Sequence, residues 1–434
     1  MKLILCFLIL IHVSVSGAVQ FELEKAILEN KLSLVSDNPN QRIQSLLLFL
    51  SSVDNIEMQS SLINQLGPGV QYHIVKAPSI SAIKLIEKLS SEINKNDLHF
   101  YDFDNCFTPW VQDFFLRMTN GAKSFLLPTY STSLQMNECR PYELGIADLL
   151  LKKNPLQFAD IDSVSYDSGL SSSSQYDLRR VDRKNGELYS NHSAYQKLFP
   201  VKTLKLFQGE GGMRLLTEKY LFIERTDWQK IESQYRLMVD SQQELRTAKS
   251  YFESVFQKEI ILIGETLKSD EFYSYHIDMF MTPMESPNGK SIIFLGHPTE
   301  AVKILGSDAI QGLKGFSQSL WMEKTTQANR IEAELIQKNF TVIRVPILFL
   351  NSNVGVKTFT YNNVLQSLDR RGRPALYIPS YEGTEIDIHS KVLEKSISKV
   401  LLDYQLQSYF VRGSKNFIEL NGQLRCSSGI LSYK

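Results

Sequence analysis

The sequence has few cysteines, no excess of either charge and no glycine motif for phosphate binding. Its 434 residues include four cysteines, and none of them stands with histidine at the spacing of a zinc finger. Basic and acidic residues balance at 47 each, so we expect no bulk electrostatic attraction for nucleic acid or an anionic membrane. The pattern G-x-G-x-x-G is missing, which argues against a dinucleotide cradle. Function must therefore be inferred from short local motifs.

The one long apolar run lies at the N-terminus. Met1 and Lys2 precede the run LILCFLILIHV and the small residues SVSGA. A basic start, an apolar stretch too short for a membrane span and a small-residue exit predict a secretory signal peptide over 1–18, with cleavage near Gly17 or Ala18. The alternative is a buried N-terminal strand. We therefore expect a secreted or periplasmic protein whose mature chain does not span a membrane.

The cysteine count bears on the same prediction. Cleavage of the signal peptide would remove Cys6 and leave three cysteines, an odd number for an exported protein. Cys106 and Cys139 are close enough in sequence to pair, although the sequence does not show that they do. If they pair, Cys426 is left as a free thiol, which is either a reactive cysteine or a buried, inert one.

Short apolar segments alternate with amphipathic ones along the chain. Strands are predicted at 45–50, 70–77, 98–103, 124–130, 204–208, 259–264, 291–297, 340–349, 374–381 and 417–423. Helices are predicted at 54–67, 79–93, 326–339 and 390–405, and a longer helical stretch covers 226–257. Strands that alternate with helices indicate the α/β class.

Residues 155–198 interrupt this alternation, because they are polar, rich in serine and without apolar periodicity. They indicate a long surface excursion, which is either a lid over a site or a disordered segment. We expect a single domain over 19–434 that carries this excursion and the helical stretch at 226–257.

Four local clusters contain residues that could carry chemistry. They are WVQD with Asp113, EGG with Glu210, HID with His276 and Asp278, and the segment around Cys426. In a strand, residues two apart point to the same face, so His276 and Asp278 would face one space together. Each cluster alone also fits a structural role, such as a cap or a surface pair. The glycines after Glu210 suit either a phosphate cradle or a close backbone approach.

Taken together, the clusters favour a cationic substrate. A thiol with a histidine suits a cysteine hydrolase. Several carboxylates around the thiol would hinder a peptidase, because negative charge opposes formation of the thiolate. Carboxylates would instead bind a guanidinium, which is planar, permanently charged and rich in N–H donors. This chemistry requires the clusters to converge in space.

The order of these motifs resembles that of the guanidine-modifying (pentein) superfamily, which includes arginine, agmatine and peptidylarginine deiminases. WVQD at 110–113 is similar to peptidylarginine deiminases. The segment YNNVLQSLDRRGRPALYIPSY at 361–381 and the approach NGQLRCSSG to the last cysteine are similar to agmatine-deiminase-like members. The similarity runs from about residue 40 to the C-terminus and consists of short motifs in the same order.

The resemblance implies a pentein fold, in which five short strand–helix–strand modules form a propeller with five-fold pseudo-symmetry and the site at its centre. Cys426 would be the nucleophile that forms a covalent thiouronium intermediate. His276 would act as general acid and then as general base. Asp113 and Asp278 would bind the guanidinium nitrogens. Glu210 would lie beside His276, and its two glycines would allow that close approach.

The resemblance extends to residues that would contact the substrate. Asn363 or Asn362 would match a substrate-side asparagine, and Trp110 would pack against the substrate's stem. Two features depart from the family. Arg425 precedes the nucleophile where agmatine deiminases tend to have histidine, and SSG follows it where Thr-Gln is frequent. Both departures argue against agmatine as the substrate.

We therefore expect a hydrolase that deiminates peptidylarginine to peptidylcitrulline and releases ammonia. The alternatives are a deiminase of small guanidines such as arginine or agmatine, an amidinotransferase, and a non-catalytic secreted protein that binds guanidinium ligands. The expected partner is an arginine-containing peptide or protein, or a small guanidino compound, with no nucleic acid. No cofactor or metal is predicted. No loop has its acidic residues at the spacing of a known calcium-binding motif, so the sequence does not decide whether the protein depends on calcium.

Overall fold

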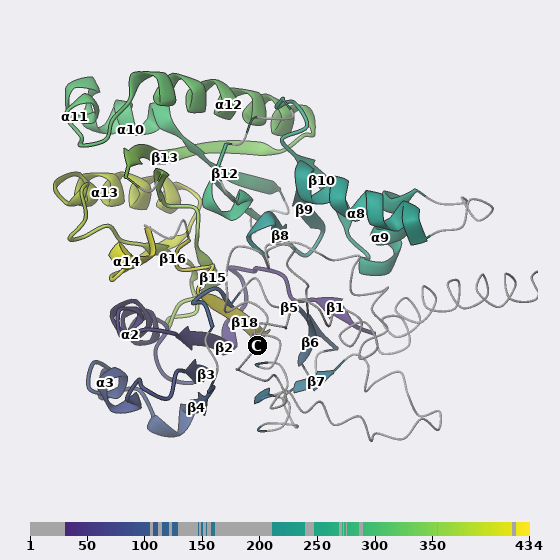
Figure 1. Cartoon of the computed structure of the whole chain (residues 1–434), viewed down its shortest axis with the longest axis vertical. Helices are drawn as coiled ribbons and strands as arrows, with labels where there is room; N and C mark the ends of the chain where they lie inside the picture. The colour runs from purple at the N-terminus through teal and green to yellow at the C-terminus, as the bar shows by residue number, and fades with distance from the viewer. Residues whose placement is uncertain are drawn as a thin grey trace, which may run out of the picture. The chain divides into compact units, whose positions relative to one another are not determined.

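The structure is a computed structural model that describes residues 31–104, 107–111, 115–120, 124–128, 146, 149–150, 153, 158–160, 211–238, 247–268, 271, 273–274, 276–285, 290–353, 355–418 and 422–434. The chain divides into two compact units, with boundaries after residues 34, 113, 209, 225 and 257. The second unit, made of 35–113, 210–225 and 258–434, contains four of the five sheets found among the described residues (Figure 1).

Each of the five sheets contains the same arrangement of three neighbouring strands. The first strand pairs antiparallel with the second, and the second pairs parallel with the third. The triplets are β18 (Ser428–Tyr433), β2 (Ile43–Leu50) and β3 (Gln71–Lys76); β5 (Phe115–Thr119), β6 (Ser124–Pro128) and β7 (Phe158–Asp160); β8 (Arg214–Leu216), β9 (Tyr220–Glu224) and β10 (Glu259–Ile263); β11 (Met281–Glu285), β12 (Ser291–His297) and β13 (Thr341–Ser352); and β15 (Leu365–Leu368), β16 (Pro374–Pro379) and β17 (Gln407–Val411). We call each triplet with its helices a module.

Three edge strands extend these sheets. They are β4 (Leu98–Asp102) beside β3, β14 (Gly355–Thr360) beside β13, and β1 (Ser33–Leu34) beside β5. Helices connect the second and third strands of four modules, as a parallel pair requires a crossover. These helices are α2 (Asn55–Leu66), α8 (Arg225–Met238), α9 (Ala248–Phe256), α10 (Pro298–Leu305), α11 (Ser307–Gln311), α12 (Gln318–Gln337) and α13 (Asp387–Asp403).

Apolar side chains of neighbouring modules form shared cores in the second unit. One core joins Leu62 of α2 and Tyr72 of β3 to Tyr377 of β16. A second joins the module of β16 to that of β12 and β13, and a third joins β12 and β13 to β9 and β10. Burying apolar side chains from two modules in one core stabilises the contact between them. The four modules therefore pack in one continuous row (Figure 1).

The observed elements confirm the predicted α/β class and change several details. The helix predicted at 79–93 is only α3 (Ala82–Ile86), followed by turns. The strand predicted at 417–423 is wrong, because the structure has the short helix α14 (Lys415–Ile418) there and forms its last strand at β18. The helical stretch at 226–257 contains two separate helices, α8 and α9. The recurrence of one module supports the predicted repeat, while five-fold symmetry about an axis stays a prediction.

None of the helices among the described residues combines the length and the apolar character needed to cross a bilayer. The predicted signal peptide at 1–18, the excursion at 155–198 and the strand at 204–208 lie outside the described residues.

Candidate active site

Cys426 lies in a tight turn that leads directly into β18. The N–H of Ser427 donates to the carbonyl of Gln423 at 3.1 Å, and the N–H of Ser428 donates to the carbonyl of Arg425 at 3.3 Å. These short-range hydrogen bonds fix the backbone on both sides of the cysteine. Cys426 is a free thiol and only 4% exposed. The turn therefore holds the sulfur inside the second unit.

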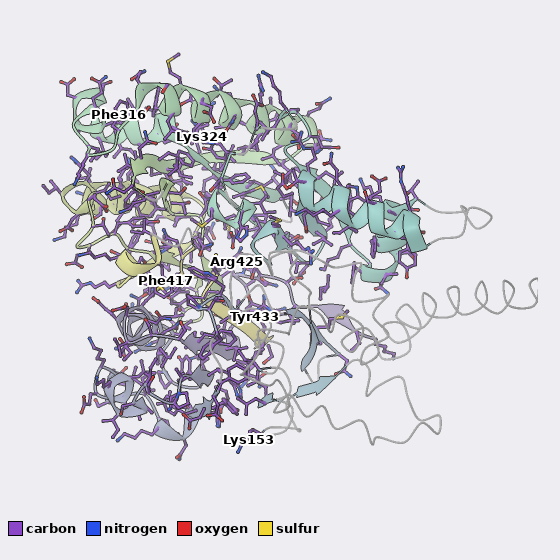
Figure 2. The ribbon with its side chains drawn as sticks, in the orientation of Figure 1. Lys153, Phe316, Lys324, Phe417, Arg425 and Tyr433 are labelled. Carbon is purple, nitrogen blue, oxygen red and sulfur yellow. The ribbon has the colours of Figure 1, made fainter. Side chains whose placement is uncertain are left out.

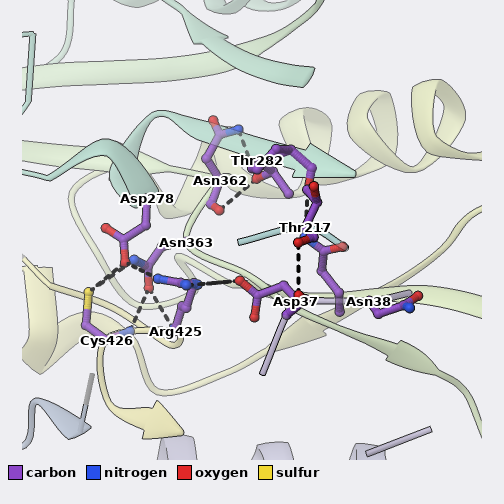
Figure 3. Close-up of polar contacts among 12 residues, drawn as sticks. Asp37, Asn38, Thr217, Asp278, Thr282, Asn362, Asn363, Arg425 and Cys426 are labelled. Atoms are coloured by element: carbon purple, nitrogen blue, oxygen red, sulfur yellow. Dashed lines mark hydrogen bonds and ion pairs between the residues drawn. The ribbon is translucent and has the colours of Figure 1, made fainter. Parts of the chain in front are cut away.

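Asn363 ties this turn to the start of the β15 module. Its Oδ1 accepts the N–H of Arg425 at 2.7 Å and the N–H of Cys426 at 3.3 Å, and its Nδ2 donates to the Cys426 Sγ at 3.1 Å (Figure 3). Asn363 is completely buried, so water does not compete for these bonds. An N–H donor aimed at sulfur stabilises negative charge that develops there. Of the two asparagines named from the sequence, Asn363 is the one beside the thiol.

His276 and Asp278 come from the start of the β11 module. The expected strand geometry is wrong: His276 is an extended residue that precedes the 3-10 helix η8 (Ile277–Met279), which contains Asp278. Both side chains nevertheless face Cys426, because one donor atom from each of the three residues lies within 4.8 Å of the others. The Cys426 thiol donates to Asp278 Oδ2 at 3.5 Å. The structure thus brings together the predicted thiol, histidine and aspartate.

The glycines of the EGG motif explain how the chain passes His276. Gly211 and Gly212 belong to the 3-10 helix η7 (Gly211–Met213), not to a strand. A Cβ placed on Gly212 would lie 2.1 Å from His276 Nδ1, which no real side chain tolerates. Glycine is therefore required there for the close approach to the imidazole. Gly212 thus makes room for the histidine, while Glu210 lies outside the described residues and its place beside His276 stays a prediction.

Arg425 and Asp37 are two charged residues of the site whose roles the sequence did not reveal. Arg425 is 3% exposed and lies inside the second unit (Figure 2). It donates to Asp37 Oδ2 at 2.9 Å and to Asp278 Oδ2 at 3.2 Å. Burial alone would lower the pKa of the Arg425 guanidinium, but the two carboxylates raise that pKa above its ordinary value. Arg425 was noted only as a departure from the family, and Asp37 was not predicted at all.

The segment that carries Asp37 is fixed against the β8 module. The Asp37 N–H donates to the carbonyl of Leu216 at 3.0 Å. Lys258 donates to Ser36 Oγ at 3.0 Å and to the Thr217 carbonyl at 2.6 Å. Burial lowers the pKa of Lys258 to about 8. Asp37 is thus presented to Arg425 by a rigid support.

The site residues occupy equivalent places in different modules. Gly212, Asn363 and Cys426 each stand two residues ahead of the first strand of their module, which is β8, β15 or β18. Asp278 stands three residues ahead of β11. The same end of β8, β11, β15 and β18 therefore faces the site. Asp113 stands two residues ahead of β5, the corresponding place in the fifth module, but it lies outside the described residues.

The other predicted site residues have different surroundings. Asn362 donates to Thr282 Oγ1 at 3.2 Å and to the Phe294 carbonyl at 2.8 Å, so it joins β11 to β12 and does not reach the thiol. Trp110 is partly buried and packs edge-on against Phe417, with ring centroids 5.7 Å apart. Cys106 and Cys139 also lie outside the described residues, so their pairing stays a prediction.

Two kinds of chemistry are compatible with this arrangement. His276, Asp278 and Cys426 offer nitrogen, oxygen and sulfur donors, which is a set that zinc accepts. However, Asp278 Oδ2 already accepts hydrogen bonds from Arg425 and from the thiol. A nucleophilic thiol with a nearby imidazole and a carboxylate needs no change in these contacts. The arrangement therefore fits covalent catalysis at a cation more directly than metal binding.

Comparisons with known proteins agree on the fold. No protein-family model and no curated protein matches the chain. Among solved structures, agmatine deiminase from C. jejuni with substrate bound has a TM-score of 0.52 at 14% identity, over 92% of this chain and 96% of that one. An assigned arginine deiminase from Porphyromonas gingivalis has a TM-score of 0.54 at 10% identity, over 93% and 99%. An assigned peptidyl-arginine deiminase has a TM-score of 0.51 at 10% identity, over 92% and 98%.

These similarities extend over nearly the whole of each chain. They show that the chain shares the fold of these solved deiminase structures. At 10–14% identity they concern the fold alone. The chemistry of the site must be argued from its own residues.

Proposed function

We propose that the protein is a cysteine-dependent hydrolase of guanidinium groups, which converts peptidylarginine to peptidylcitrulline and releases ammonia. The observation that carries the proposal is the convergence of the thiol, the imidazole and the Asp278 carboxylate within 4.8 Å, from positions 148 residues apart in the chain. The names of the proteins that share the fold, which include agmatine, arginine and peptidyl-arginine deiminases, support the same chemistry.

The reaction would proceed in two halves. The Cys426 sulfur attacks the guanidinium carbon, one C–N bond breaks, and His276 protonates the departing ammonia. A thiouronium intermediate remains on the sulfur. Water then attacks the same carbon and gives one proton to His276. The C–S bond breaks, the second proton of the water passes to solvent, and the thiolate and a neutral ureido product are released. Asp278 would bind an N–H of the cation, and the Asn363 amide would stabilise charge on the sulfur.

Asp113 and Glu210 complete the proposal. Asp113 occupies the place in its module that Cys426 and Asn363 occupy in theirs, which supports a second guanidinium-binding carboxylate. Glu210 directly precedes the glycines that pass His276, which supports a carboxylate beside the imidazole. We propose that all groups needed for the reaction belong to the chain, without a metal. Activity that survives EDTA and gains nothing from added calcium or zinc would support this point.

Peptidylarginine is the proposed substrate because the N-terminal signal pattern predicts export and no pattern of free-amino-acid contacts was found. Free arginine and agmatine are the alternatives. An amidinotransferase would use the same intermediate, with an amine in place of water. N-terminal sequencing of protein recovered from outside the producing cells tests the export.

The decisive experiment measures citrulline formation and ammonia release from a blocked arginine peptide, free arginine and agmatine. We expect product from the blocked peptide and at most about one per cent of that rate from the small guanidines. Cys426→Ala should abolish turnover, since no other group can form the intermediate, while ligand binding stays measurable. If only free arginine or agmatine gives product, that small guanidine is the substrate and peptidylarginine is not. If none of the three compounds gives product but the protein still binds them, the alternative of a non-catalytic binding protein is favoured.

A further inference from the structure

Arg425 directly precedes Cys426, the proposed nucleophile, and places a guanidinium group of the chain itself in the site. Its Nη1 donates to Asp278 Oδ2 at 3.2 Å, and its Nε and Nη2 donate to Asp37 Oδ2 at 3.3 Å and 2.9 Å (Figure 3). All three side chains are buried, with exposed fractions of 3% for Arg425, 0% for Asp278 and 6% for Asp37. A buried arginine held from both sides has little freedom to leave.

Asp278 uses its two carboxylate oxygens differently. Oδ2 accepts from Arg425 and from the Cys426 thiol. Oδ1 is buried and accepts no hydrogen bond from the residues that the structure describes, and Figure 3 shows that oxygen pointing away from both partners. Buried carboxylate oxygens without a donor are rare in folded proteins, because their desolvation is then uncompensated. A ligand N–H would supply the hydrogen bond that this oxygen lacks.

The contact from Arg425 sets which oxygen is left for a ligand. A carboxylate turns easily about its terminal torsion, so only its partners define its orientation. Arg425 holds Oδ2 and so directs Oδ1 to the opposite side. Arg425 is fixed in turn by Asp37 and by the Asn363 Oδ1 that accepts its backbone N–H at 2.7 Å.

Arg425 also adjusts the charge of the site. Asp37 and Asp278 contribute two negative charges and Arg425 one positive charge, which leaves a net charge of −1 for the three groups. Two uncompensated carboxylates beside the sulfur would oppose a thiolate strongly. A net charge of −1 is balanced by one guanidinium or amidinium ligand. The buried set therefore matches a single cationic group.

We propose that Arg425, held by Asp37, is a positioning residue that orients the carboxylate of Asp278 so that Oδ1 accepts an N–H of a cationic guanidinium or amidinium substrate. The inference rests on the proposed function. It assigns a role to two residues, Arg425 and Asp37, that do not touch the reacting atoms.

Two alkylating agents of the same shape test this role. The full chain is treated with 2-chloroacetamidine, which is cationic, and with 2-chloroacetamide, which is neutral, and the modification rate of Cys426 is followed by peptide mass mapping. The ratio of the two rates measures how well the site holds the amidinium. Arg425→Lys should lower this ratio about tenfold, because a lysine cannot bridge two carboxylates with a planar fork. Asp37→Asn should lower it about threefold, because Arg425 loses one of its two supports.

Arg373→Lys is the matched control, because Arg373 also binds a buried aspartate, Asp369, and should leave the ratio unchanged. If Arg425→Lys does not fold, Asp37→Asn decides alone. A wild-type preference for the amidine that persists in the variants overturns the inference and leaves the proposed function standing. Equal loss of both rates in the variants also overturns it, since that pattern indicates general damage. No amidine preference in the wild type overturns the proposed function and the inference with it.

Discussion

Two buried aspartates of the second unit each bind an arginine, and they differ in what they leave unfilled. Asp369, after β15, uses both oxygens: Oδ1 accepts the N–H groups of Arg371 and Arg373, and Oδ2 accepts from the Arg373 side chain and the Tyr409 hydroxyl. Backbone and side-chain hydrogen bonds from Arg373 oppose the effect of burial and lower the pKa of Asp369. Among the described residues, Asp278 uses only Oδ2, and its buried Oδ1 has no donor.

This difference separates a structural carboxylate from one that serves a ligand. A structural group gains most stability when every acceptor is filled, because each unmet buried acceptor costs about 1–3 kcal/mol. A binding group must keep an acceptor open for its ligand, and the fold bears that cost. The open acceptor of Asp278 therefore supports the proposed ligand-binding role without reference to any relative.

The largest expected effect comes from exchanging each aspartate for asparagine. Asp278→Asn should lower kcat/KM about 1000-fold, because it removes the negative charge that binds the cation. Asp369→Asn should instead lower the free energy of unfolding by about 2 kcal/mol with little change in kcat/KM, because several hydrogen bonds lose a charged acceptor. Steady-state kinetics and urea unfolding of both variants measure the two effects. If Asp278→Asn and Asp369→Asn lose activity equally, the two aspartates do not differ in function.

Gly212→Ala tests whether the backbone beside His276 belongs to the functional region. The added Cβ would lie 2.1 Å from His276 Nδ1, so the imidazole must move. We expect kcat to fall about 100-fold, since a displacement of about 1 Å at a catalytic group has that cost. Gly312→Ala is the control, because its Cβ would come no closer than 3.3 Å to Asp308 O. Full activity of the Gly212 variant would show that the histidine does not need its present position.

Two adjacent asparagines repeat the comparison on a smaller scale. Asn363→Ala should lower kcat about tenfold, because the thiol loses the amide at 3.1 Å. Asn362→Ala should leave kcat nearly unchanged and lower the free energy of unfolding by about 2 kcal/mol, because it leaves the Phe294 carbonyl without its donor. Thermal unfolding and kinetics of both variants check this division. The reverse pattern would show that the roles are exchanged.

The smallest effect concerns Lys258, a buried cation that is fully bonded to Ser36, Thr217 and Glu218. Burial lowers its pKa from 10.5 to about 8. As the pH falls from 10.5 to 8, the unfolded chain therefore binds a proton that the folded chain does not, and stability falls; below pH 8 the penalty is constant. Relative to Lys258→Met, the wild type should gain about 1 kcal/mol between pH 8 and pH 10.5. Urea unfolding at both pH values measures this gain, and a difference independent of pH would contradict it.

Sequence reasoning located the residues that carry recognisable chemistry. Cys426, His276, Asp278 and Asn363 were named from motif order and from the needs of a guanidinium, and the structure places them together. The glycines after Glu210 were predicted to allow a close approach of the backbone to His276. Gly212 lies at such an approach, where a Cβ would clash with the imidazole. Short motifs sufficed here because several of them occur in one order, although each alone also fits a structural role.

The ion pair of Asp37 with Arg425 could not be predicted from the sequence. Asp37 lies in the stretch SDNPN, which is typical of a turn, and its pairing with Arg425 spans 388 residues. No local pattern encodes such a contact. The helix predicted at 79–93 failed for a related reason, since the Ser90 N–H is bound by Asn64 of α2 at 2.7 Å and the chain turns there. The run at 417–423 was too short to distinguish a strand from a helical turn.

The pairing of β18 with β2 has a consequence for the order of folding. The two strands pair from Ser428 opposite Leu48 to Tyr433 opposite Ile43, with register shifts on both sides of Ser432. They are separated by nearly the whole sequence. Closing so large a loop is slow compared with forming a single module. Since Cys426 directly precedes β18, its sulfur reaches Asn363 only after this closure. A newly made chain would therefore carry a thiol without the Asn363 contact until its most distant segments have met.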